Sequence, residues 1–410
     1  MKNSSLRRLI GVTAAAAVFA LAGCSGGGTD AAATDEEIVI GFLGPLTGTN
    51  AEIGENQVAG AEIAVEAINE AGGVDGRKLR LEVQDEGTTP DTASAAVRTL
   101  ANNGISLIAG MLSSANCLAL APQLESLGVV FVNATCTNDD LTGKDGAAAP
   151  FDRFFRVGNN DSRGVVKFAE FMAERFPKLK NYSVFAYDYV TGHAILDSYK
   201  ETVEKAGREF NILGGEGFWV PLGEQNFSLQ IQALVKQPSN PETDALYLGT
   251  FGGGTGSFLQ QSASYNLNDL YGVIMQNGGY YPIARTLGGE APNVWNSYDY
   301  FYDAFDTEMN KMFNEKYEEK MGKKPTTWAY QGLQTIYAYA AAIEKAGSSN
   351  VDDVLAALPG IQYESPSGTR TIDAVTHQAD GPVVMMNSVG NKDAVEGVEM
   401  LETVVVEADE

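Results

Sequence analysis

The chain has 410 residues, which is more than one hydrophobic core usually supports, so at least two domains are expected. Asp and Glu number 53 against 28 Lys and Arg, and a net charge of −25 disfavours nucleic acid as a partner. With 2 His and 3 Cys, the sequence offers little for a metal site built from those ligands, and a disulfide-dense small fold is excluded.

The N-terminal segment predicts export. A basic start and the uncharged run 9–22 are typical of a signal peptide, and the run is shorter than the about 20 apolar residues that cross a bilayer. Leu21-Ala22-Gly23-Cys24 resembles the bacterial lipobox, which implies removal of residues 1–23 and lipid on Cys24. Residues 24–36 then form a flexible tether. We expect an extracytoplasmic lipoprotein anchored to a cell membrane, in the periplasm or on the outer surface; the alternative is a chance cysteine behind a simple secretory signal.

Processing would leave two cysteines and a more acidic chain. The signal carries three basic and no acidic residues, so its removal changes the net charge to −28. Cys117 and Cys136 would then lie in a potentially oxidising compartment. A disulfide between them would close a loop of about 20 residues and contribute about 3 kcal/mol. Two buried free thiols are an equally good interpretation.

From residue 38, short β-branched runs alternate with helical stretches. The expected strands are 38–42, 79–83, 105–109 and 129–132. Gly72-Gly73 ends the first helical stretch, and Thr89-Pro90 begins the second, with Thr as the cap and Pro at the first helical position. A third helix runs through Leu120 and Leu124. This alternation predicts a parallel sheet covered by helices on both faces.

The alternation begins again after the loop 138–150. The expected strands of this second set are 154–157, 182–186, 210–213, 245–248 and 271–275. Residues 277–297 are rich in Gly, Pro and Tyr and are interpreted as a crossing loop. Helices are expected at about 299–321 and 327–346. The tail offers strand candidates at 383–389 and 398–406. Two sets of this kind predict two α/β domains.

The motifs of the common enzyme classes are missing. Gly252-Gly253-Gly254-Thr255-Gly256 lies where a phosphate loop would lie, but Ser257 occupies the last glycine position of G-x-G-x-x-G. His193 and His377 are far apart, and neither falls in a metal-binding spacing. No nucleophile elbow G-x-S-x-G occurs. We expect neither enzymatic activity, nor a cofactor, nor a metal site.

Five segments in order carry a resemblance to a known family. Ile40 to Gly48 and Ala67 to Gly76 resemble the opening of ABC-transporter solute-binding proteins of the branched-chain amino-acid type, a group within the type I periplasmic-binding family. Ile108 to Ser114, Thr135 to Leu141 and Gly288 to Ala291 fit the same family. The resemblance therefore covers most of the chain after the signal.

The resemblance implies an α/β fold of the type I periplasmic-binding class. Two doubly wound parallel-sheet lobes would be joined by a three-strand hinge, with the ligand between them. The implied first lobe comprises residues 37–156 plus 281–364, and the second comprises 157–280 plus 365–410. In open parallel sheets, ligands lie beyond the carboxyl ends of the strands.

The resemblance also implies ligand-binding residues in the first lobe. Ser113 and Ser114 follow the third strand, and Ser114 matches the family serine that holds the ligand's carboxylate. Thr135 and Thr137 follow the fourth strand and match positions that complete this carboxylate site. Helix capping is the alternative role for all four residues, and one residue can do both.

In the second lobe, the resemblance implies an aromatic contact from Tyr187 or Tyr189, and Phe251 stands where a tyrosine is usual. Gln276 and Asn277 stand where the family has a glutamate that pairs with the ligand's ammonium. Loss of that carboxylate removes about 1.5–3 kcal/mol, or roughly 10–100-fold in affinity. This departure argues against leucine, isoleucine or valine. Asp188 would supply a substitute charge, or the ligand has no ammonium, so amino acids, amides and small or aromatic carboxylates all stay open.

The expected function is a monomeric, lipid-anchored solute receptor that captures a small polar organic ligand by hinge closure and delivers it to an ABC permease in the membrane. The alternative is a ligand-sensing domain that acts with a separate signalling partner.

Overall fold

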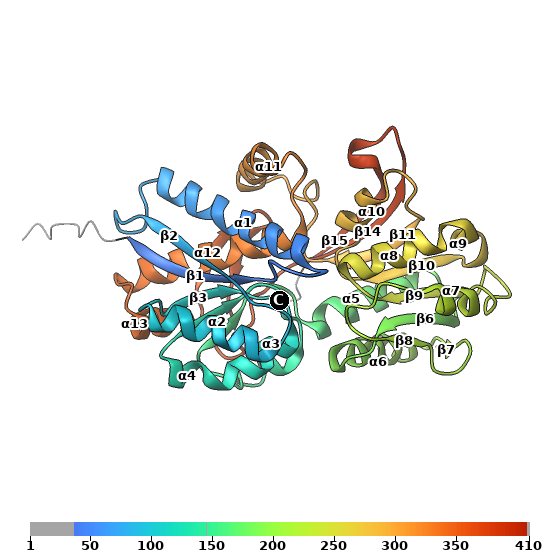
Figure 1. The fold of residues 1–410 in the computed structure, drawn as a ribbon, viewed down its shortest axis with the longest axis horizontal. Coiled ribbons are helices and arrows are strands. Elements are labelled where there is room, and N and C mark those ends of the chain that lie inside the picture. The colour runs from blue at the N-terminus through green and yellow to red at the C-terminus, as the bar shows by residue number, and fades with distance from the viewer. Residues whose placement is uncertain (1–36, 145, 408–410) are drawn as a thin grey trace, which may run out of the picture. The chain divides into compact units, whose positions relative to one another are not determined.

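The computed structural model describes residues 37–144 and 146–407, and two large β-sheets organise them (Figure 1). The predicted signal peptide, Cys24 and the tether to residue 36 lie outside the described residues. Among the residues described, no helix is long and apolar enough to span a membrane. No group of three or more His, Cys, Asp or Glu within this part of the chain is placed to hold a metal ion.

The first sheet is parallel throughout and has the strand order β2-β1-β3-β4-β5. Its strands are β1 (Ile38–Gly44), β2 (Leu79–Asp85), β3 (Leu107–Gly110), β4 (Val130–Asn133) and β5 (Phe154–Arg156). Successive side chains point to opposite faces, so Phe42 packs in one core and Leu43 in the other. Both residues are fully buried, which agrees with the near-continuous apolar runs of this sheet.

Helices cover both faces of the first sheet. One face is covered by α1 (Ala51–Glu70), α12 (Thr327–Ala346) and α13 (Val351–Ala357), and the other by α2 (Pro90–Asn102), α3 (Ser114–Leu120) and α4 (Leu124–Leu127). Thr89 caps α2 as predicted, because its hydroxyl accepts a hydrogen bond from the Thr92 N–H at 3.3 Å. Gly60 brings α1 close to α12, since a Cβ there would lie 1.8 Å from the Ala329 carbonyl oxygen.

The second sheet is mixed and has the order β15-β14-β11-β10-β9-β6-β7, with β8 also paired to β6. Its strands are β6 (Asn181–Tyr187), β7 (Asn211–Ile212), β8 (Phe218–Val220), β9 (Asp244–Gly249), β10 (Val273–Asn277), β11 (Val294–Tyr298), β14 (Val383–Gly390) and β15 (Val398–Val406). Strands β14 and β15 are antiparallel to their neighbours, whereas the rest are parallel.

The second sheet also has a core on each face. One core contains α5 (Asp161–Arg175) and α6 (Val190–Lys205), and the other contains α7 (Ser228–Leu234), α8 (Gly252–Ser262), α9 (Leu267–Leu270) and α10 (Tyr280–Thr286). The remaining elements are α11 (Glu308–Met321), the hairpin of β12 (Gln362–Ser365) and β13 (Gly368–Thr371), and four short 3-10 turns, η1 (Ala121–Gln123), η2 (Asp139–Leu141), η3 (Ala263–Tyr265) and η4 (Val395–Gly397). Each sheet is therefore sandwiched between helices, which confirms the predicted fold class.

Three connecting segments pass between the two sheets and their cores. They are residues 157–160, 299–307 and 372–382. We call the first sheet with its packed helices the first lobe, and the second sheet with its helices the second lobe. Residues 280–298 pack in the second lobe, and Tyr363, Ile372 and Ala379 pack in the first. This packing places residues 281–298 in the second lobe and Ile372 and Ala379 in the first, on the other side of the expected boundaries at 281 and 365. The expected lobe boundaries stay a prediction.

Two stretches differ from the elements expected from the sequence. Residues 277–297 contain α10 and the start of β11 rather than a continuous loop. Helix α11 begins at Glu308, not near 299, because the Thr307 hydroxyl accepts a hydrogen bond from the Asn310 N–H at 2.9 Å and caps the helix there. Phe301 and Phe305 have helical spacing, yet they enter the cores from irregular chain.

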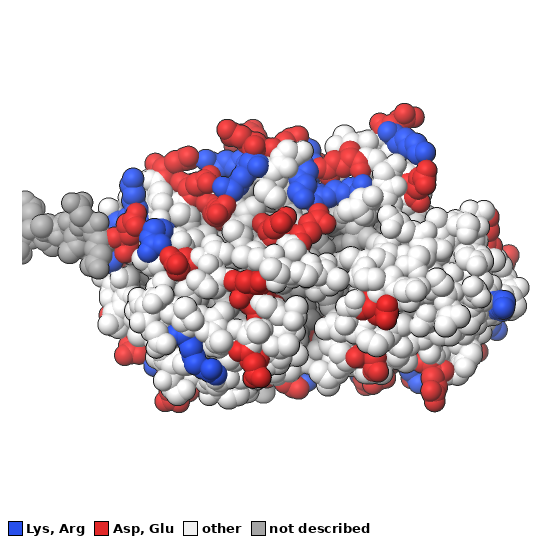
Figure 2. Space-filling model, in the orientation of Figure 1, with Lys and Arg blue, Asp and Glu red and all other residues white. Residues whose placement is uncertain are grey.

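Acidic and basic side chains lie close together over α1 and α11, while the face over α8 and α9 in the same view carries few charges (Figure 2). Lys316 bonds Glu70 at 2.8 Å, and Lys320 bonds Glu62 and Glu66 at 3.0 Å. These pairs are largely exposed, so each contributes little to stability. The charged side chains on this face form a solvated outer surface.

Candidate functional site

A cavity of about 210 Å³ is lined by residues of both lobes, at the carboxyl ends of the parallel strands. Its polar lining residues are Asn50, Ser113, Ser114, Thr135, Thr137, Asn159, Asn160, Asp161, Ser297, Asp299 and Gln331. Its apolar and aromatic lining includes Ile53, Leu112, Val165, Tyr189, Ile195, Leu222, Phe251, Tyr298 and Trp328. The volume is more than ten times the roughly 10–15 Å³ that one water needs and is below the roughly 300–1,000 Å³ of sites for drug-sized molecules. The cavity therefore suits a small ligand.

The loop after β3 presents Ser113 and Ser114 to this cavity. Glu86 holds the loop from behind, because its carboxylate accepts hydrogen bonds from the N–H groups of Leu112 at 2.8 Å and Ser113 at 3.3 Å. Burial raises the pKa of Glu86 to about 7, and those hydrogen bonds oppose the rise. Ser113 stands at the N-cap of α3 but makes no side-chain capping bond. Capping therefore does not occupy its hydroxyl.

Thr135 and Thr137 follow β4 and both line the cavity, but their hydroxyls have different surroundings. The Thr135 hydroxyl accepts a hydrogen bond from Gln57 at 2.6 Å and donates one to Gln331 at 2.5 Å. Thr135 is thus part of a buried polar network within the first lobe. Thr137 hydrogen-bonds the carboxyl group of Asp161, so its hydroxyl faces the ionisable part of the site.

Arg156 supports the loop after β4 and does not line the cavity. It is fully buried, and its guanidinium donates to the carbonyls of Cys136 at 2.9 Å and Asn138 at 2.8 Å. It also donates to Thr142 at 2.5 Å and to Gln378 at 2.5 Å, and Gln378 lies in a connecting segment. Burial lowers the pKa of Arg156 to about 10, which leaves it cationic at neutral pH.

A disulfide bond joins Cys117 to Cys136, with an S–S distance of 2.01 Å. Cys117 lies in α3, three residues after Ser114, and Cys136 lies between the two cavity threonines. The bond therefore connects the two first-lobe loops that line the cavity.

Asp161 is a buried carboxyl group in the cavity wall. It is the first residue of α5, follows β5, and is 7% exposed. Burial raises its pKa to about 7, Asp139 raises it further, and the Thr137 hydrogen bond and the charge of Arg156 oppose the rise. A positive group brought into the cavity would favour the ionised form of this carboxyl.

Asp299 is the second buried carboxyl group of the cavity wall, and the protein itself satisfies it. Thr327 donates to it at 2.6 Å, Gln331 at 2.8 Å, and the Asn159 N–H at 3.3 Å. Burial raises the pKa of Asp299 against these hydrogen bonds. Asp299 anchors the Thr135–Gln331 network, whereas Asp161 is more open to a ligand.

In the second lobe, Tyr189 and Phe251 line the cavity and Tyr187 does not. The ring of Tyr187 instead packs edge-on against Phe251, with the centroids 5.2 Å apart. Asp188 is exposed and bonds His193 at 2.8 Å, so it does not supply the charge that the sequence suggested. The remaining predicted positions are on β10.

Gln276 is fully buried and does not line the cavity. Its amide donates to the carbonyls of Thr250 at 2.9 Å and Gly278 at 2.7 Å, which fixes the turn after β10. Asn277 is the last residue of β10, and its side chain lies outside the described part of the structure. The case against a branched-chain ligand assumed that Gln276 faces the ligand. In the structure, the Gln276 side chain bonds its own turn and does not line the cavity.

Several lining residues were missed by the sequence reasoning. Asp161 stands just beyond the carboxyl end of β5, so the rule that ligands lie at strand ends would have found it. Tyr298 and Asp299 were hidden because β11 was interpreted as a loop. Trp328 and Gln331 come from α12, whose approach to the cavity no local pattern indicates.

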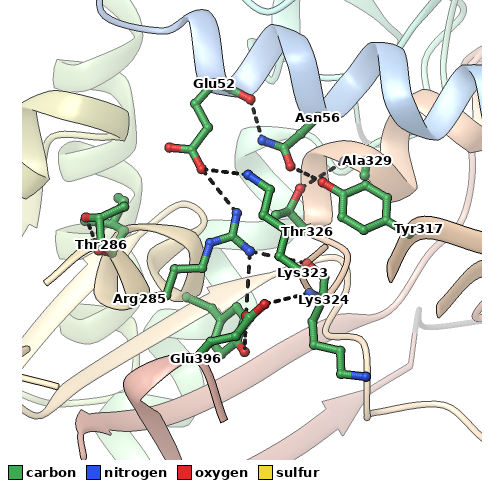
Figure 3. Close-up of polar contacts among 12 residues, drawn as sticks. Glu52, Asn56, Arg285, Thr286, Tyr317, Lys323, Lys324, Thr326, Ala329 and Glu396 are labelled. Atoms are coloured by element: carbon green, nitrogen blue, oxygen red, sulfur yellow. Dashed lines mark hydrogen bonds and ion pairs between the residues drawn. The ribbon is translucent and has the colours of Figure 1, made fainter. Parts of the chain in front are cut away.

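A polar cluster joins the lobes outside the cavity (Figure 3). Arg285 of α10 is 8% exposed and points toward Glu52 of α1, with a distance of 3.1 Å. It also donates to the Lys324 carbonyl at 3.2 Å, and Glu396 accepts from the Lys324 N–H at 2.7 Å. Lys323 bonds Glu52 at 3.4 Å. We call Glu52, Arg285, Lys323, Lys324 and Glu396 the interlobe cluster.

A family model described as periplasmic binding protein matches residues 37–393, nearly all of the described chain. The chain belongs to the periplasmic binding protein family. The leucine-, isoleucine-, valine-, threonine- and alanine-binding protein of Pseudomonas aeruginosa is 26% identical over 340 residues, 82% of this chain and 86% of the relative. A Leu/Ile/Val-binding protein homologue of Brucella melitensis is 26% identical over 86% of this chain and 90% of its own length. The predicted resemblance to branched-chain amino-acid solute-binding proteins is confirmed.

Solved structures show the same fold. The leucine-binding protein of Thermotoga maritima matches with a TM-score of 0.73 and 21% identity, over 90% of this chain and 98% of that chain. A solute-binding protein of Rhodopseudomonas palustris in complex with benzoate matches with a TM-score of 0.76 and 18% identity, over 92% and 98%. Periplasmic binding proteins are small-molecule receptors of ABC transporters and not enzymes. This binding protein is accordingly an extracytoplasmic receptor, and the sensing alternative is not favoured.

Proposed function

We propose that this binding protein captures an α-amino acid with an apolar or aromatic side chain and delivers it to an ABC importer. The observation that carries the proposal is the pairing, in one cavity, of serine and threonine hydroxyls with the buried carboxyl group of Asp161. An α-amino acid has the matching pair of groups, a carboxylate and an ammonium one carbon apart.

The ligand's carboxylate would be held by Ser113, Ser114 and Thr137. The hydroxyls of Ser113 and Ser114 are donors at the first-lobe wall, and the Thr137 hydroxyl would turn from Asp161 to the ligand's carboxylate once the ammonium takes its place at Asp161. No basic side chain lines the cavity among the residues described. Hydroxyl and main-chain donors then replace water around the carboxylate. Thr135 would form part of the cavity wall without bonding the carboxylate, because its hydroxyl is hydrogen-bonded to Gln57 and Gln331.

The ligand's ammonium would pair with Asp161. An ionised carboxylate buried without a partner is costly, and an ammonium within hydrogen-bonding distance would offset that cost. This role replaces the glutamate that the family resemblance placed at Gln276 or Asn277. It also removes the objection to leucine, because Gln276 is used by the turn after β10.

The ligand's side chain would lie among the rings of Tyr189, Phe251 and Trp328. These rings come from both lobes, so a ligand that touches them all favours the arrangement in which the lobes approach each other. Closure by motion at the three connecting segments would give the permease a ligand-dependent surface to recognise.

The proposed location is a membrane surface outside the cytoplasm, with a lipid on Cys24, a tether to residue 36, and a monomeric receptor body. The support is the lipobox-like sequence before Cys24. In cells fed a labelled fatty acid, the full chain should be labelled and sediment with membranes, and Cys24→Ser should be unlabelled. Equal labelling of both proteins would contradict the anchor.

The binding proposal is tested by calorimetric titration of the Cys24→Ser full chain with a panel of amino acids, their amides, and aromatic acids including benzoate and 4-hydroxybenzoate. At least one apolar or aromatic amino acid should bind with a Kd of about 1 μM or tighter. Tightest binding of an aromatic acid would show that the aromatic rings, not Asp161, determine the ligand class. Binding of none of the panel would contradict the proposal.

A further inference from the structure

The Cys117–Cys136 disulfide occupies an unusual place relative to the cavity. Cys136 is the residue between Thr135 and Thr137, and Cys117 is one helical turn after Ser114. Both cysteines are fully buried. The bond is therefore the single covalent cross-link, within the described residues, between the two loops that carry the cavity hydroxyls of the first lobe.

Hydrogen bonds also join these loops, which pack together in one apolar core. The Asn133 amide donates to the Gly110 carbonyl at 2.9 Å, and the Asn138 N–H donates to the Ser114 hydroxyl at 3.3 Å. The Ala134 N–H donates to the same Gly110 carbonyl at 3.0 Å. Each of these bonds is exchanged for bonds to water when the loops separate, so each has a small net effect. The disulfide is a covalent bond that water cannot replace, so it prevents the two cysteines from separating.

The loop after β3 also has a backbone that needs support. Gly110 has φ 100° and the next residue, Met111, has φ 70°, in the region that favours glycine. A non-glycine residue in this region persists only where its surroundings hold it, and it is found preferentially at ligand sites. Glu86 and the disulfide hold the residues that directly follow, Leu112 to Cys117.

We propose that the Cys117–Cys136 disulfide is a positioning element of the ligand site: it holds the two hydroxyl-bearing loops in their binding arrangement, so the oxidised protein binds its ligand more tightly than the reduced protein. The proposal rests on the proposed function, since it requires a small ligand in this cavity. Loops that are already in place lose less conformational freedom when the ligand binds, which is the general basis of preorganisation.

The proposal has a reciprocal consequence. If oxidation strengthens ligand binding by some factor, the ligand must make the disulfide harder to reduce by the same factor. Reduction adds two electrons and two protons to the disulfide and yields the thiols of Cys117 and Cys136. In the experiment dithiothreitol supplies both and becomes its own cyclic disulfide. A disulfide that only stabilises the fold would show no dependence on ligand, provided that circular dichroism shows the reduced protein to be folded.

The test uses the full chain with Cys24→Ser, so that only the two cysteines in question are present, and L-leucine or L-phenylalanine, whichever binds more tightly. Affinity is measured by calorimetry for the oxidised protein, the reduced protein, and the Cys117→Ser/Cys136→Ser variant. Reduction and the double substitution should each weaken ligand binding about tenfold, because the two loops would then have to be ordered when the ligand binds. Circular dichroism and melting of each sample establish that it is folded at the titration temperature.

The second measurement does not depend on any variant folding. The protein is equilibrated in mixtures of reduced and oxidised dithiothreitol, with and without the amino acid at about 100 times its Kd, and free thiols are counted by alkylation and mass spectrometry. The ratio of reduced to oxidised dithiothreitol at half reduction should rise about tenfold with ligand. An unchanged ratio together with equal affinity in both redox states would overturn this inference alone. If neither amino acid binds the oxidised protein, the proposed function is overturned as well.

Discussion

Replacement of Asp161 by Asn should weaken ligand binding and stabilise the unliganded protein. Asp161 is 7% exposed, and burial raises the pKa of its carboxyl group to about 7. Loss of a charge-assisted hydrogen bond to the ligand's ammonium costs about 1.5–3 kcal/mol, or roughly 10–100-fold in Kd. Asn keeps the size of the side chain, so the cavity shape changes little.

The stability effect has a definite sign. The folded-state pKa lies above the ordinary value of 3.8, so the folded protein holds a proton that the unfolded chain has lost between about pH 4 and pH 7. The stability contributed by the protonated carboxyl is complete below about pH 4 and is lost as the pH rises through 7. At pH 8 the wild type carries a buried carboxylate at this position, whereas the Asp161→Asn variant carries a neutral amide.

Two effects oppose each other at pH 8 in the unliganded protein. Asp161 is the first residue of α5, where a negative charge contributes about 0.3–1 kcal/mol through the helix dipole. Burial of the charge outweighs this gain, because burial raises the pKa of Asp161 to about 7 despite the opposing Thr137 hydrogen bond and the charge of Arg156. We therefore expect Asp161→Asn to melt at a higher temperature than the wild type at pH 8, with the difference shrinking toward pH 4.

The assays are calorimetric titration for affinity and a thermal melt of the unliganded protein at pH 4, 6 and 8. Asp140→Asn is the matched control, because Asp140 lies in the nearby turn η2, pairs with Lys144 at 3.0 Å and does not line the cavity. The wild type should bind its amino acid more tightly at pH 8 than at pH 6, as Asp161 ionises. Unchanged affinity in Asp161→Asn, or a lower melting temperature at pH 8, would refute the reasoning.

Four further substitutions separate binding, closure and folding. Ser114→Ala and Thr137→Val should each weaken binding about tenfold with little change in the unliganded melting temperature, whereas a large loss of stability would indicate a structural role alone. Arg285→Gln should weaken ligand binding mainly through faster ligand dissociation, measured by stopped flow, because Arg285 bonds Glu52 across the lobes. The control Arg175→Gln removes an exposed ion pair within the second lobe and should leave the dissociation rate unchanged. Thr135→Val should lower the free energy of unfolding by about 1–3 kcal/mol, since it leaves buried Gln57 and Gln331 without their shared partner, and an unchanged melt would contradict that.

Much of the fold was predictable because its local signals agree with the tertiary structure. The apolar runs at β1 and β9 are long enough to be strands buried on both faces, and Thr89-Pro90 begins α2 as the capping rules require. The pattern failed between residues 277 and 307. There the seven-residue helix α10 begins after two glycines, and Phe301 and Phe305 imitate a helix while they pack from irregular chain.

The candidate site was predictable only where loops follow recognised strands. Ser113, Ser114, Thr137, Tyr189 and Phe251 all line the cavity, because each follows a strand whose end was placed correctly. The family pattern directed attention to Gln276, whose amide is used by its own turn. Trp328 and Gln331 approach from a helix that is far away in sequence, and only the packing of α12 reveals them.

The identity of the group that faces Asp161 decides the account. The direct measurement is a paired titration of the Cys24→Ser full chain at pH 8 with L-leucine and L-phenylalanine and with their deaminated counterparts, 4-methylpentanoate and 3-phenylpropanoate. We predict that at least one amino acid binds with a Kd of about 1 μM or tighter and that its deaminated counterpart binds at least about tenfold more weakly. A deaminated acid that binds as tightly as its amino acid would contradict the account.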